Sequence, residues 1–188
     1  MTKKVFAMFA SGAEISGTGF SNVYTKLLAE LFSKFFAAMK YGGSNQGLMY
    51  QFASEFSDSG GQVIGIYPSW VVKEGIVADF SSAIEVDDLA ERKVEIVKDV
   101  DAILCLPGGV GTLDELFTFM AQVHVGELGR SIPIFFYDYN GYYRPLELMF
   151  QVMAQSKALQ ANMFSLHFLE TYESFEVTLR CLFGDDVN

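Results

Sequence analysis

The chain has 188 residues, of which 51% are hydrophobic and 19% charged, and its formal net charge is −10. That length suits one domain, since domains average roughly 100–200 residues. The large apolar fraction excludes a disordered chain, whose mark is low hydrophobicity with high net charge. The acidic excess argues against binding polymeric DNA or RNA or an anionic membrane surface, because Lys and Arg hold those partners. We therefore expect a globular protein whose anionic ligands, where it binds them, are small.

Cysteine usage and hydropathy indicate a cellular compartment. Cys105 and Cys181 are too few for a disulfide framework and suit a reducing cytosol. The apolar stretch of residues 5–10 is shorter than the roughly 7–15 residues of a signal-peptide core, and no segment approaches the ~20 apolar residues of a membrane span. His124 and His167 lack Cys or acidic neighbours at zinc-site spacing. The sequence predicts a cytoplasmic protein without a membrane segment or a bound metal.

Short apolar runs alternate with segments of helical periodicity. The predicted strands are Val5–Phe9, Phe36–Tyr41, Val63–Tyr67, Ala102–Leu106 and Ile134–Tyr137. The predicted helices between them cover Val23–Phe35, Leu48–Phe56, Leu89–Val100 and Leu116–Val123. Strands that alternate with helices form βαβ units with right-handed crossovers, and continuously apolar strands are typical of parallel sheets buried on both faces. The pattern predicts an α/β domain with a doubly wound parallel sheet flanked by helices.

After Gly141 the chain becomes Phe- and Met-rich helical sequence, and it closes with a predicted helix over Tyr172–Phe183. No repeat, low-complexity tract or linker interrupts the sequence. We therefore expect a single domain over residues 1–188, with 151–188 as a helical tail. The excess of Phe and Met in helices is typical of an oligomer interface and favours a homodimer.

Three glycine-rich loops follow predicted strands, at 11–19, 41–49 and 107–115. In an open parallel sheet, ligands bind beyond the carboxyl ends of the strands, where such loops lie. The third loop is the most informative, because glycines let backbone N–H groups approach an anion and the helix starting near Thr112 directs its positive dipole end there. These features predict a phosphate cradle. The glycines equally fit a tight strand-to-helix turn in which Thr112 or Asp114 is an ordinary helix-start residue.

The third loop differs from the common nucleotide motifs. Its spacing is not G-x-G-x-x-G and it lacks Gly-Lys-Ser/Thr, which argues against hydride transfer and NTP hydrolysis. Upstream, Arg92 and Lys93 form a cation pair in an acidic protein. They either face the phosphate loop or lie on a solvated helix face, paired with Asp88 or Glu95.

Together these segments resemble a known family. Arg92-Lys93 followed by 107–115 resembles the R-K…P-G-G-x-G-T-x-x-E signature of the LOG (LONELY GUY) family, cytokinin-activating nucleoside 5′-monophosphate phosphoribohydrolases long labelled "lysine decarboxylases". The loop 41–49 resembles that family's Y-G-G-G-x-x-G-L-M motif, and Gly141–Tyr143 resembles its G-Y-Y. The resemblance spans residues 4–150, with the motifs in the family's order.

The resemblance implies a Rossmann-like domain, a homodimer, that hydrolyses the N-glycosidic bond of a nucleoside 5′-monophosphate without a cofactor. The substrate would be a cytokinin riboside 5′-monophosphate or an AMP-like nucleotide, and the products the free base and ribose 5-phosphate. Arg92 and Glu115 fall on the catalytic positions. The phosphate- and substrate-binding positions fall on Gly108, Gly109, Gly111, Thr112, Lys93, Ser11, Gly43 and Met49.

The residue types suit that chemistry. Ribosyl cleavage passes through an oxocarbenium-like state, which a carboxylate such as Glu115 stabilises and for which it also orients a water. Arg92 would bind the phosphate or the departing base. A structural interpretation of Glu115 is also open: a carboxylate in the first turns of a helix is favoured by the helix dipole.

Some positions depart from the family pattern. Ser44 replaces the third glycine of Y-G-G-G, Tyr50 replaces a small residue, and Leu89 replaces a methionine. These changes leave the identity of the accepted base undetermined. A bulkier pocket wall would either exclude N6-prenyl adenines or select a different base. Tyr142 and Tyr143 fit either stacking on a base or packing at a turn.

Two other functions are considered: a carrier of molybdenum cofactor and a lysine decarboxylase. A carrier of molybdenum cofactor, itself a phosphorylated ligand, uses the same fold and keeps the glycine loop without needing Arg92 and Glu115, so retention of both favours the enzyme. A pyridoxal-phosphate lysine decarboxylase is excluded, since nothing marks a Schiff-base lysine beside a cofactor-phosphate site.

Overall fold

The computed structural model describes residues 4–15, 22–80, 82–128, 131–160 and 163–184. In these residues, seven parallel strands form one sheet in the order β4-β3-β2-β1-β5-β6-β7. The strands are β1 (Val5–Phe9), β2 (Ala38–Tyr41), β3 (Gln62–Pro68), β4 (Ser82–Val86), β5 (Ala102–Cys105), β6 (Pro133–Tyr137) and β7 (Ser165–Leu169). The helices are α1 (Asn22–Phe35), α2 (Gly47–Asp58), α3 (Ser69–Lys73), α4 (Leu89–Val97), α5 (Val110–His124), a 3-10 turn η1 (Tyr139–Gly141), α6 (Arg144–Gln155) and α7 (Tyr172–Phe183).

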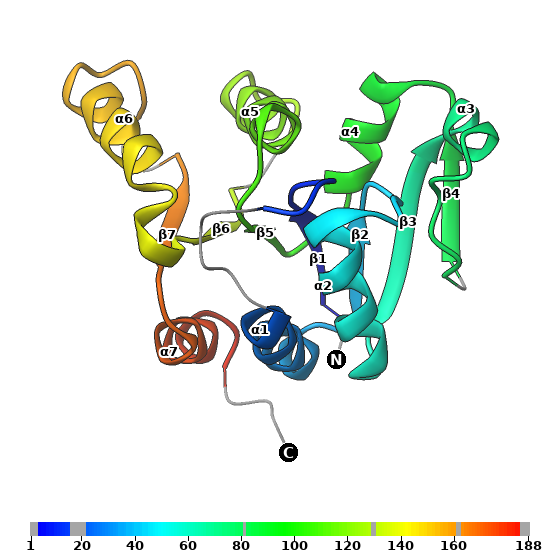
Figure 1. Ribbon diagram of the computed structural model, residues 1–188. Coiled ribbons are helices and arrows are strands. Elements are labelled where there is room, and N and C mark those ends of the chain that lie inside the picture. Colours follow the sequence, from blue (N-terminus) through cyan, green and yellow to red (C-terminus); the bar gives the residue numbers. More distant parts are fainter. Residues whose placement is uncertain (1–3, 16–21, 81, 129–130, 161–162, 185–188) are drawn as a thin grey trace.

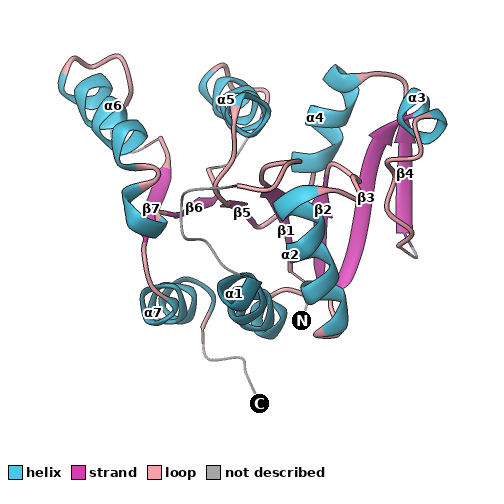
Figure 2. Ribbon diagram, in the orientation of Figure 1, coloured by secondary structure: helices cyan, strands magenta, loops and turns pink. Residues whose placement is uncertain are grey.

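Helices cover both faces of the sheet, which confirms the doubly wound α/β fold (Figures 1 and 2). Helices α1, α2 and α7 lie on one face, and α4, α5 and α6 on the other. The core is divided accordingly into two clusters, because successive residues of a strand point to opposite faces. Phe6 packs under α1 and α2, whereas its neighbour Ala7 packs under α4 and α5. None of the helices in the described segments is long and apolar enough to cross a membrane.

The strand order places the ligand-binding end of the sheet. From the central β1, the chain proceeds to β2, β3 and β4 in one direction and to β5, β6 and β7 in the other. The loops that leave β1 and β5 therefore diverge to opposite faces. In open α/β sheets such a divergence forms a crevice beyond the carboxyl ends of the two strands, where ligands bind. The glycine-rich loop at 107–115 leaves β5, and residues 11–15 follow β1 and contact it through Ser11 and Pro107, so two of the three predicted loops meet at this switch point. Residues 16–19 of the predicted loop lie outside the described residues.

The structure corrects the expected tail. Residues 151–188 are not helical throughout, because β7 pairs in parallel with β6 and completes the sheet. The other edge strand, β4, was also not predicted. Both edge strands carry polar residues, such as Glu85 and His167, and β7 is only half-buried along its length. Edge strands therefore lack the continuous apolar run by which the central strands were predicted. The predicted helix Tyr172–Phe183 is confirmed as α7.

Candidate functional site

The N-terminus of α5 presents uncapped donors to open space. Gly109 occupies the N-cap position, and none of the described side chains caps this helix. A Cβ built on Gly109 or Gly111 would meet no atom of the described residues within 4 Å. Thr112 is only 3% exposed, and its hydroxyl has no hydrogen-bond partner in the described part of the chain. Free N–H groups, a positive dipole end and an unpaired buried hydroxyl together suit a bound anion.

Gly108 is a glycine for a different reason. A Cβ at this position would lie 2.0 Å from the hydroxyl oxygen of Thr112 and 3.0 Å from the backbone nitrogen of Ser11. Glycine here lets the turn close against both residues, and it thereby sets where the Thr112 hydroxyl points. Of the three predicted cradle glycines, Gly109 and Gly111 leave room for a ligand and Gly108 shapes the turn.

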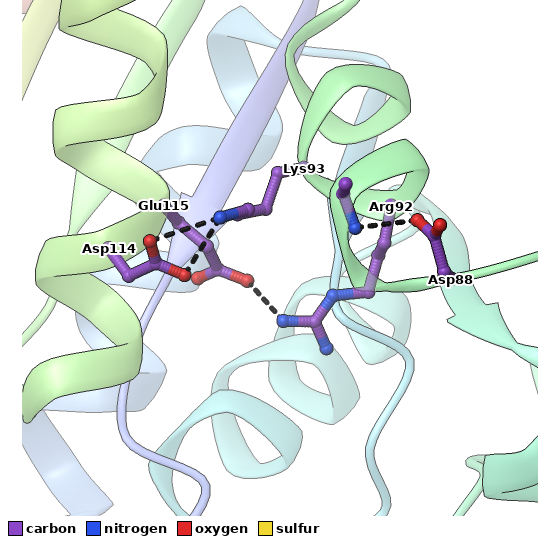
Figure 3. A network of polar contacts seen from close by, with 6 residues as sticks. Asp88, Arg92, Lys93, Asp114 and Glu115 are labelled. Carbon is purple, nitrogen blue, oxygen red and sulfur yellow. Dashed lines mark hydrogen bonds and ion pairs between the residues drawn. The ribbon is translucent and has the colours of Figure 1, made fainter.

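Glu115 lies one turn after Thr112 on α5 and faces Arg92 of α4 (Figure 3). Nη2 of Arg92 donates to Oε1 of Glu115 at 2.8 Å, and the carboxylate is 6% exposed. Beside this pair, Nζ of Lys93 donates to the carboxylate of Asp114 at 3.0 Å. Arg92 and Lys93 therefore bridge α4 to α5, and the expected alternative pairing with Asp88 or Glu95 is wrong. The predicted residues Arg92, Lys93 and Glu115 lie together.

Arg92 keeps a free donor at this site. Its Nε is buried and has no hydrogen-bond partner among the described residues, although its Nη2 is engaged by Glu115. An unpaired buried donor costs free energy unless a ligand or water satisfies it. Arg92 therefore has donor capacity left for an anionic or polar group in the crevice.

Burial controls the charge of Glu115. Loss of hydration raises the pKa of its carboxyl to about 7, which means that the penalty of burial exceeds the attraction of Arg92. The neighbouring Asp114 carboxylate raises this pKa further and Lys93 lowers it. A carboxyl group that titrates near neutrality beside an anion site is typical of a catalytic acid or base.

Helix α4 holds Arg92 and Lys93 in place because both of its ends are fixed. At the N-terminus, Oδ1 of Asp88 accepts hydrogen bonds from the backbone N–H groups two and three residues further on, at 2.8 and 2.9 Å. At the C-terminus, Nζ of Lys40, which extends from β2, donates to two backbone carbonyls at 3.0 and 2.9 Å. Asp88 thus caps the helix and is not an ion-pair partner of Arg92.

The loop after β1 is joined to the cradle through Ser11. Its backbone N–H donates to the carbonyl of Pro107 at 3.3 Å, and its own carbonyl accepts from the N–H of Met49 at 3.1 Å. Gly47, at a φ of +66°, makes this junction possible, because a Cβ there would lie 2.3 Å from the backbone of Gly12. The predicted pocket residues Ser11 and Met49 are therefore adjacent at the switch point.

Gly42 lies beside the Arg92–Glu115 ion pair, whereas Gly43, which was predicted as a substrate-binding residue, does not. A Cβ on Gly42 would lie 3.2 Å from Nη1 of Arg92 and 3.9 Å from Oε1 of Glu115. Gly43 adopts a φ of +73° and packs against the ring of Tyr67, which a Cβ would approach to 2.7 Å. Sequence reasoning missed Gly42; its position directly after a predicted buried strand is the signal that marks it as a residue of the crevice.

The described residues hold two free cysteines and no cluster of possible metal ligands. Across the residues that the structure describes, no group of three or more His, Cys, Asp and Glu side chains is arranged to hold a metal ion. Cys105 is buried in β5, and Cys181 is exposed on α7.

A family model and several known proteins are similar to this chain over much of its length. A family model described as "possible lysine decarboxylase" matches residues 49–177. The cytokinin riboside 5′-monophosphate phosphoribohydrolase LOG5 of Arabidopsis thaliana is 33% identical over 128 residues, which cover 68% of this chain and 55% of LOG5. The phosphoribohydrolase of the same name from Rhodococcoides fascians is 36% identical over 108 residues, covering 56% of this chain and 54% of that protein. The chain spans about half the length of the curated relatives it matches.

Solved structures with this fold include a molybdenum cofactor binding protein. The one from the phototrophic bacterium Rippkaea orientalis has a TM-score of 0.67 at 18% identity, with 97% of this chain and 98% of that chain covered. At such low identity the likeness shows the fold alone. The family model, by contrast, covers more than half of the chain and includes both Glu115 and Arg92. The chain belongs to the LOG family, whose model carries the description "possible lysine decarboxylase".

Proposed function

We propose that this protein hydrolyses the N-glycosidic bond of a nucleoside 5′-monophosphate to a free base and ribose 5-phosphate. The observation that carries the proposal is the position of a buried carboxyl, Glu115, one helical turn after Thr112 at the uncapped N-terminus of α5. A phosphate held at the cradle would bring the attached ribose toward this carboxyl. The relatives named phosphoribohydrolases, about one third identical in sequence, support the same activity.

The residues would divide the reaction between them. The N–H groups at the start of α5 and the Thr112 hydroxyl would bind the 5′-phosphate. The Glu115 carboxylate would stabilise the positive charge that develops on the ribose and orient the attacking water. Water adds to C1′ while the bond from C1′ to the base nitrogen breaks, and the base departs with a proton. Arg92 would hold Glu115 in place and contact the phosphate or the base.

The base is the least defined part of the substrate. We propose adenine or an N6-prenyl adenine, in keeping with the relatives' names. Ser44, which replaces a glycine of the family motif, is accommodated in a turn, where its hydroxyl accepts from the N–H of Gln46 at 3.2 Å. Tyr50 is 37% exposed, and its ring lies against Phe80 with centroids 6.0 Å apart. Neither change alters the cradle or the Arg92–Glu115 pair.

A carrier of a phosphorylated ligand is the second candidate. The fold supports it, because the molybdenum cofactor carrier protein MCP from Chlamydomonas reinhardtii has a similar structure. The two match with a TM-score of 0.68 at 15% identity, over 96% of this chain and 98% of the MCP chain. The cradle alone would serve such a ligand. The Arg92–Glu115 pair favours hydrolysis, because a carrier has no need of a carboxyl that titrates near neutrality.

We also propose that the protein acts in the cytoplasm as a homodimer. The outer sides of α5 and α6 support a contact between copies, since they expose apolar side chains. These are Phe117, Leu148, Met149 and Val152, which are 40–58% exposed. Large exposed apolar side chains gathered on neighbouring helices are typical of an interface.

The test of the enzyme is a panel of AMP, GMP, CMP, UMP and N6-isopentenyl-AMP, with free base and ribose 5-phosphate measured by chromatography. We expect release from an adenine nucleotide, and a kcat/KM for AMP about tenfold or more above that for adenosine, because charge-assisted hydrogen bonds contribute ~1.5–3 kcal/mol each. A folded sample that releases base from none of these nucleotides would contradict hydrolysis and favour the carrier. Equal rates with adenosine and AMP would contradict the phosphate cradle.

Changing Gly111 to Ala separates binding from folding. The added methyl group meets no atom of the described residues within 4 Å, so the fold should accept it, and Ala is the better helix former by up to about 1 kcal/mol. We expect equal or higher thermal stability together with at least about tenfold weaker binding of ribose 5-phosphate, because the methyl fills space beside the N–H donors. Calorimetric titration and thermal unfolding measure the two effects. Unchanged affinity would exclude Gly111 from the cradle.

A further inference from the structure

Three consecutive carbonyl groups lead into the cradle, and each accepts a hydrogen bond from another segment of the chain. The bonds are Tyr143 O–H to the Leu106 carbonyl at 2.6 Å, Ser11 N–H to the Pro107 carbonyl at 3.3 Å and Tyr142 O–H to the Gly108 carbonyl at 3.0 Å. The next carbonyl, that of Gly109, accepts from Leu113 within α5. The backbone oxygens from Leu106 to Gly109 are therefore all engaged.

This matters because an anion distinguishes the two ends of a peptide group. A backbone N–H attracts phosphate, whereas a carbonyl oxygen carries partial negative charge and repels it. A glycine-rich turn has unusual backbone freedom, so its peptide groups rotate more easily than others. A rotation at Gly108 would turn the carbonyl toward the crevice and the following N–H away from it. Phosphate binding at this turn therefore requires that the carbonyl oxygens point away from the bound phosphate.

The two tyrosines are themselves firmly placed. Tyr143 is 3% exposed, and its backbone N–H donates to the buried carboxyl of Asp138, just after β6. Tyr142 is half-buried, and its ring meets that of Tyr143 edge-on, with centroids 5.2 Å apart and planes at 82°. Helix α6 begins at the next residue. The hydroxyls thus reach the β5–α5 turn from a rigid neighbouring segment, and the packing of both tyrosines at a turn is favoured over stacking on a base.

We propose that Tyr142 and Tyr143 are positioning residues, whose hydroxyls keep the carbonyls of Leu106 and Gly108 turned away from the bound phosphate. The inference deepens the proposed function and rests on its phosphate-binding step alone. It holds for any ligand that enters the cradle through a phosphate group. The tyrosines do not contact the reacting atoms.

The experiment changes Tyr142 to Phe, which keeps the ring and removes the hydroxyl. We expect ribose 5-phosphate to bind about fivefold more weakly by calorimetric titration, the effect of one neutral hydrogen bond. KM for the nucleotide should rise by the same factor with kcat within about twofold, since phosphate binding is common to the ground and transition states. Tyr143→Phe should act in the same direction. Tyr139→Phe is the control. Tyr139 lies on the preceding 3-10 turn, where its ring packs against that of Tyr24 with centroids 5.1 Å apart, so this variant should bind ribose 5-phosphate as tightly as the wild type.

The outcomes separate this inference from the proposed hydrolysis. If Tyr142→Phe and Tyr143→Phe bind ribose 5-phosphate as tightly as the wild type, the positioning role is overturned. It is also overturned if the variants lose thermal stability while the affinity of the folded fraction is unchanged. A wild-type protein that binds ribose 5-phosphate but releases no base would reject hydrolysis and leave this inference intact. A wild type that does not bind ribose 5-phosphate would overturn both.

Discussion

Replacing Glu115 with Gln is expected to lower turnover of the nucleotide by about a thousandfold or more, the scale on which preorganised charge contributes to catalysis. Gln fills the same volume and keeps an oxygen for Arg92, which contacts the carboxylate at 2.8 Å. What it lacks is the negative charge that would stabilise an oxocarbenium-like transition state and orient water. Because that charge acts on the transition state and not on the phosphate, ribose 5-phosphate should bind within about threefold of the wild type.

The matched control for this variant is Asp114→Asn. Asp114 is the adjacent carboxylate on α5, but it is 56% exposed and pairs with Lys93 at the surface. Its loss should change turnover by no more than about threefold, since exposed ion pairs contribute about 0–1 kcal/mol. Steady-state rates of base release for the two variants measure the difference. If Glu115→Gln retained the wild-type rate, or if the two variants lost activity equally, Glu115 would have no special role in the reaction.

The positions of Glu115 and the cradle were predictable because one motif contains both. A glycine-rich turn after a buried strand, followed by a helix, fixes the N–H groups at the helix start and places a carboxyl one turn later. The contact between Arg92 and Glu115 does not follow from the motif spacing, since 23 residues separate them. It follows from topology: α4 precedes β5, α5 follows it, and both lie on the same face of the sheet (Figure 1). Spacing alone left open whether Arg92 faces the glycine-rich loop or solvent, and the family resemblance assigned Arg92 and Glu115 to the same site.

Other features depend on tertiary contacts that a single sequence does not display. The hydroxyls of Tyr142 and Tyr143 reach the β5–α5 turn from beyond β6. The edge strand β7 carries Ser165 and His167 among apolar residues, so its pattern does not match that of a strand buried on both faces. The sequence shows neither the contacts of the tyrosine hydroxyls nor the pairing of β7 with β6, because the partner of each lies on another element.

The stability of the protein should fall as pH rises through the range in which Glu115 ionises. Burial raises the pKa of this carboxyl from 4.5 to about 7. Between these values the folded protein binds a proton that the unfolded chain has released, so the free energy of unfolding decreases with increasing pH. The shift corresponds to about 3 kcal/mol lost from below pH 4.5 to above pH 7. Glu115→Gln removes the titrating group, so this contribution to the pH dependence is absent from the variant.

Urea unfolding of the wild type and Glu115→Gln at pH 5 and pH 8 measures this contribution, because other titrating groups are common to both proteins. The drop in unfolding free energy between the two pH values should be larger in the wild type by about 2–3 kcal/mol. Equal drops would mean that Glu115 ionises near its ordinary pKa. The rate of base release should move in the opposite direction and rise through about pH 7, because the reaction uses the carboxylate. The ionised form that the chemistry requires is thus the form that burial makes unfavourable, so conditions that increase the active fraction of the enzyme also reduce its stability.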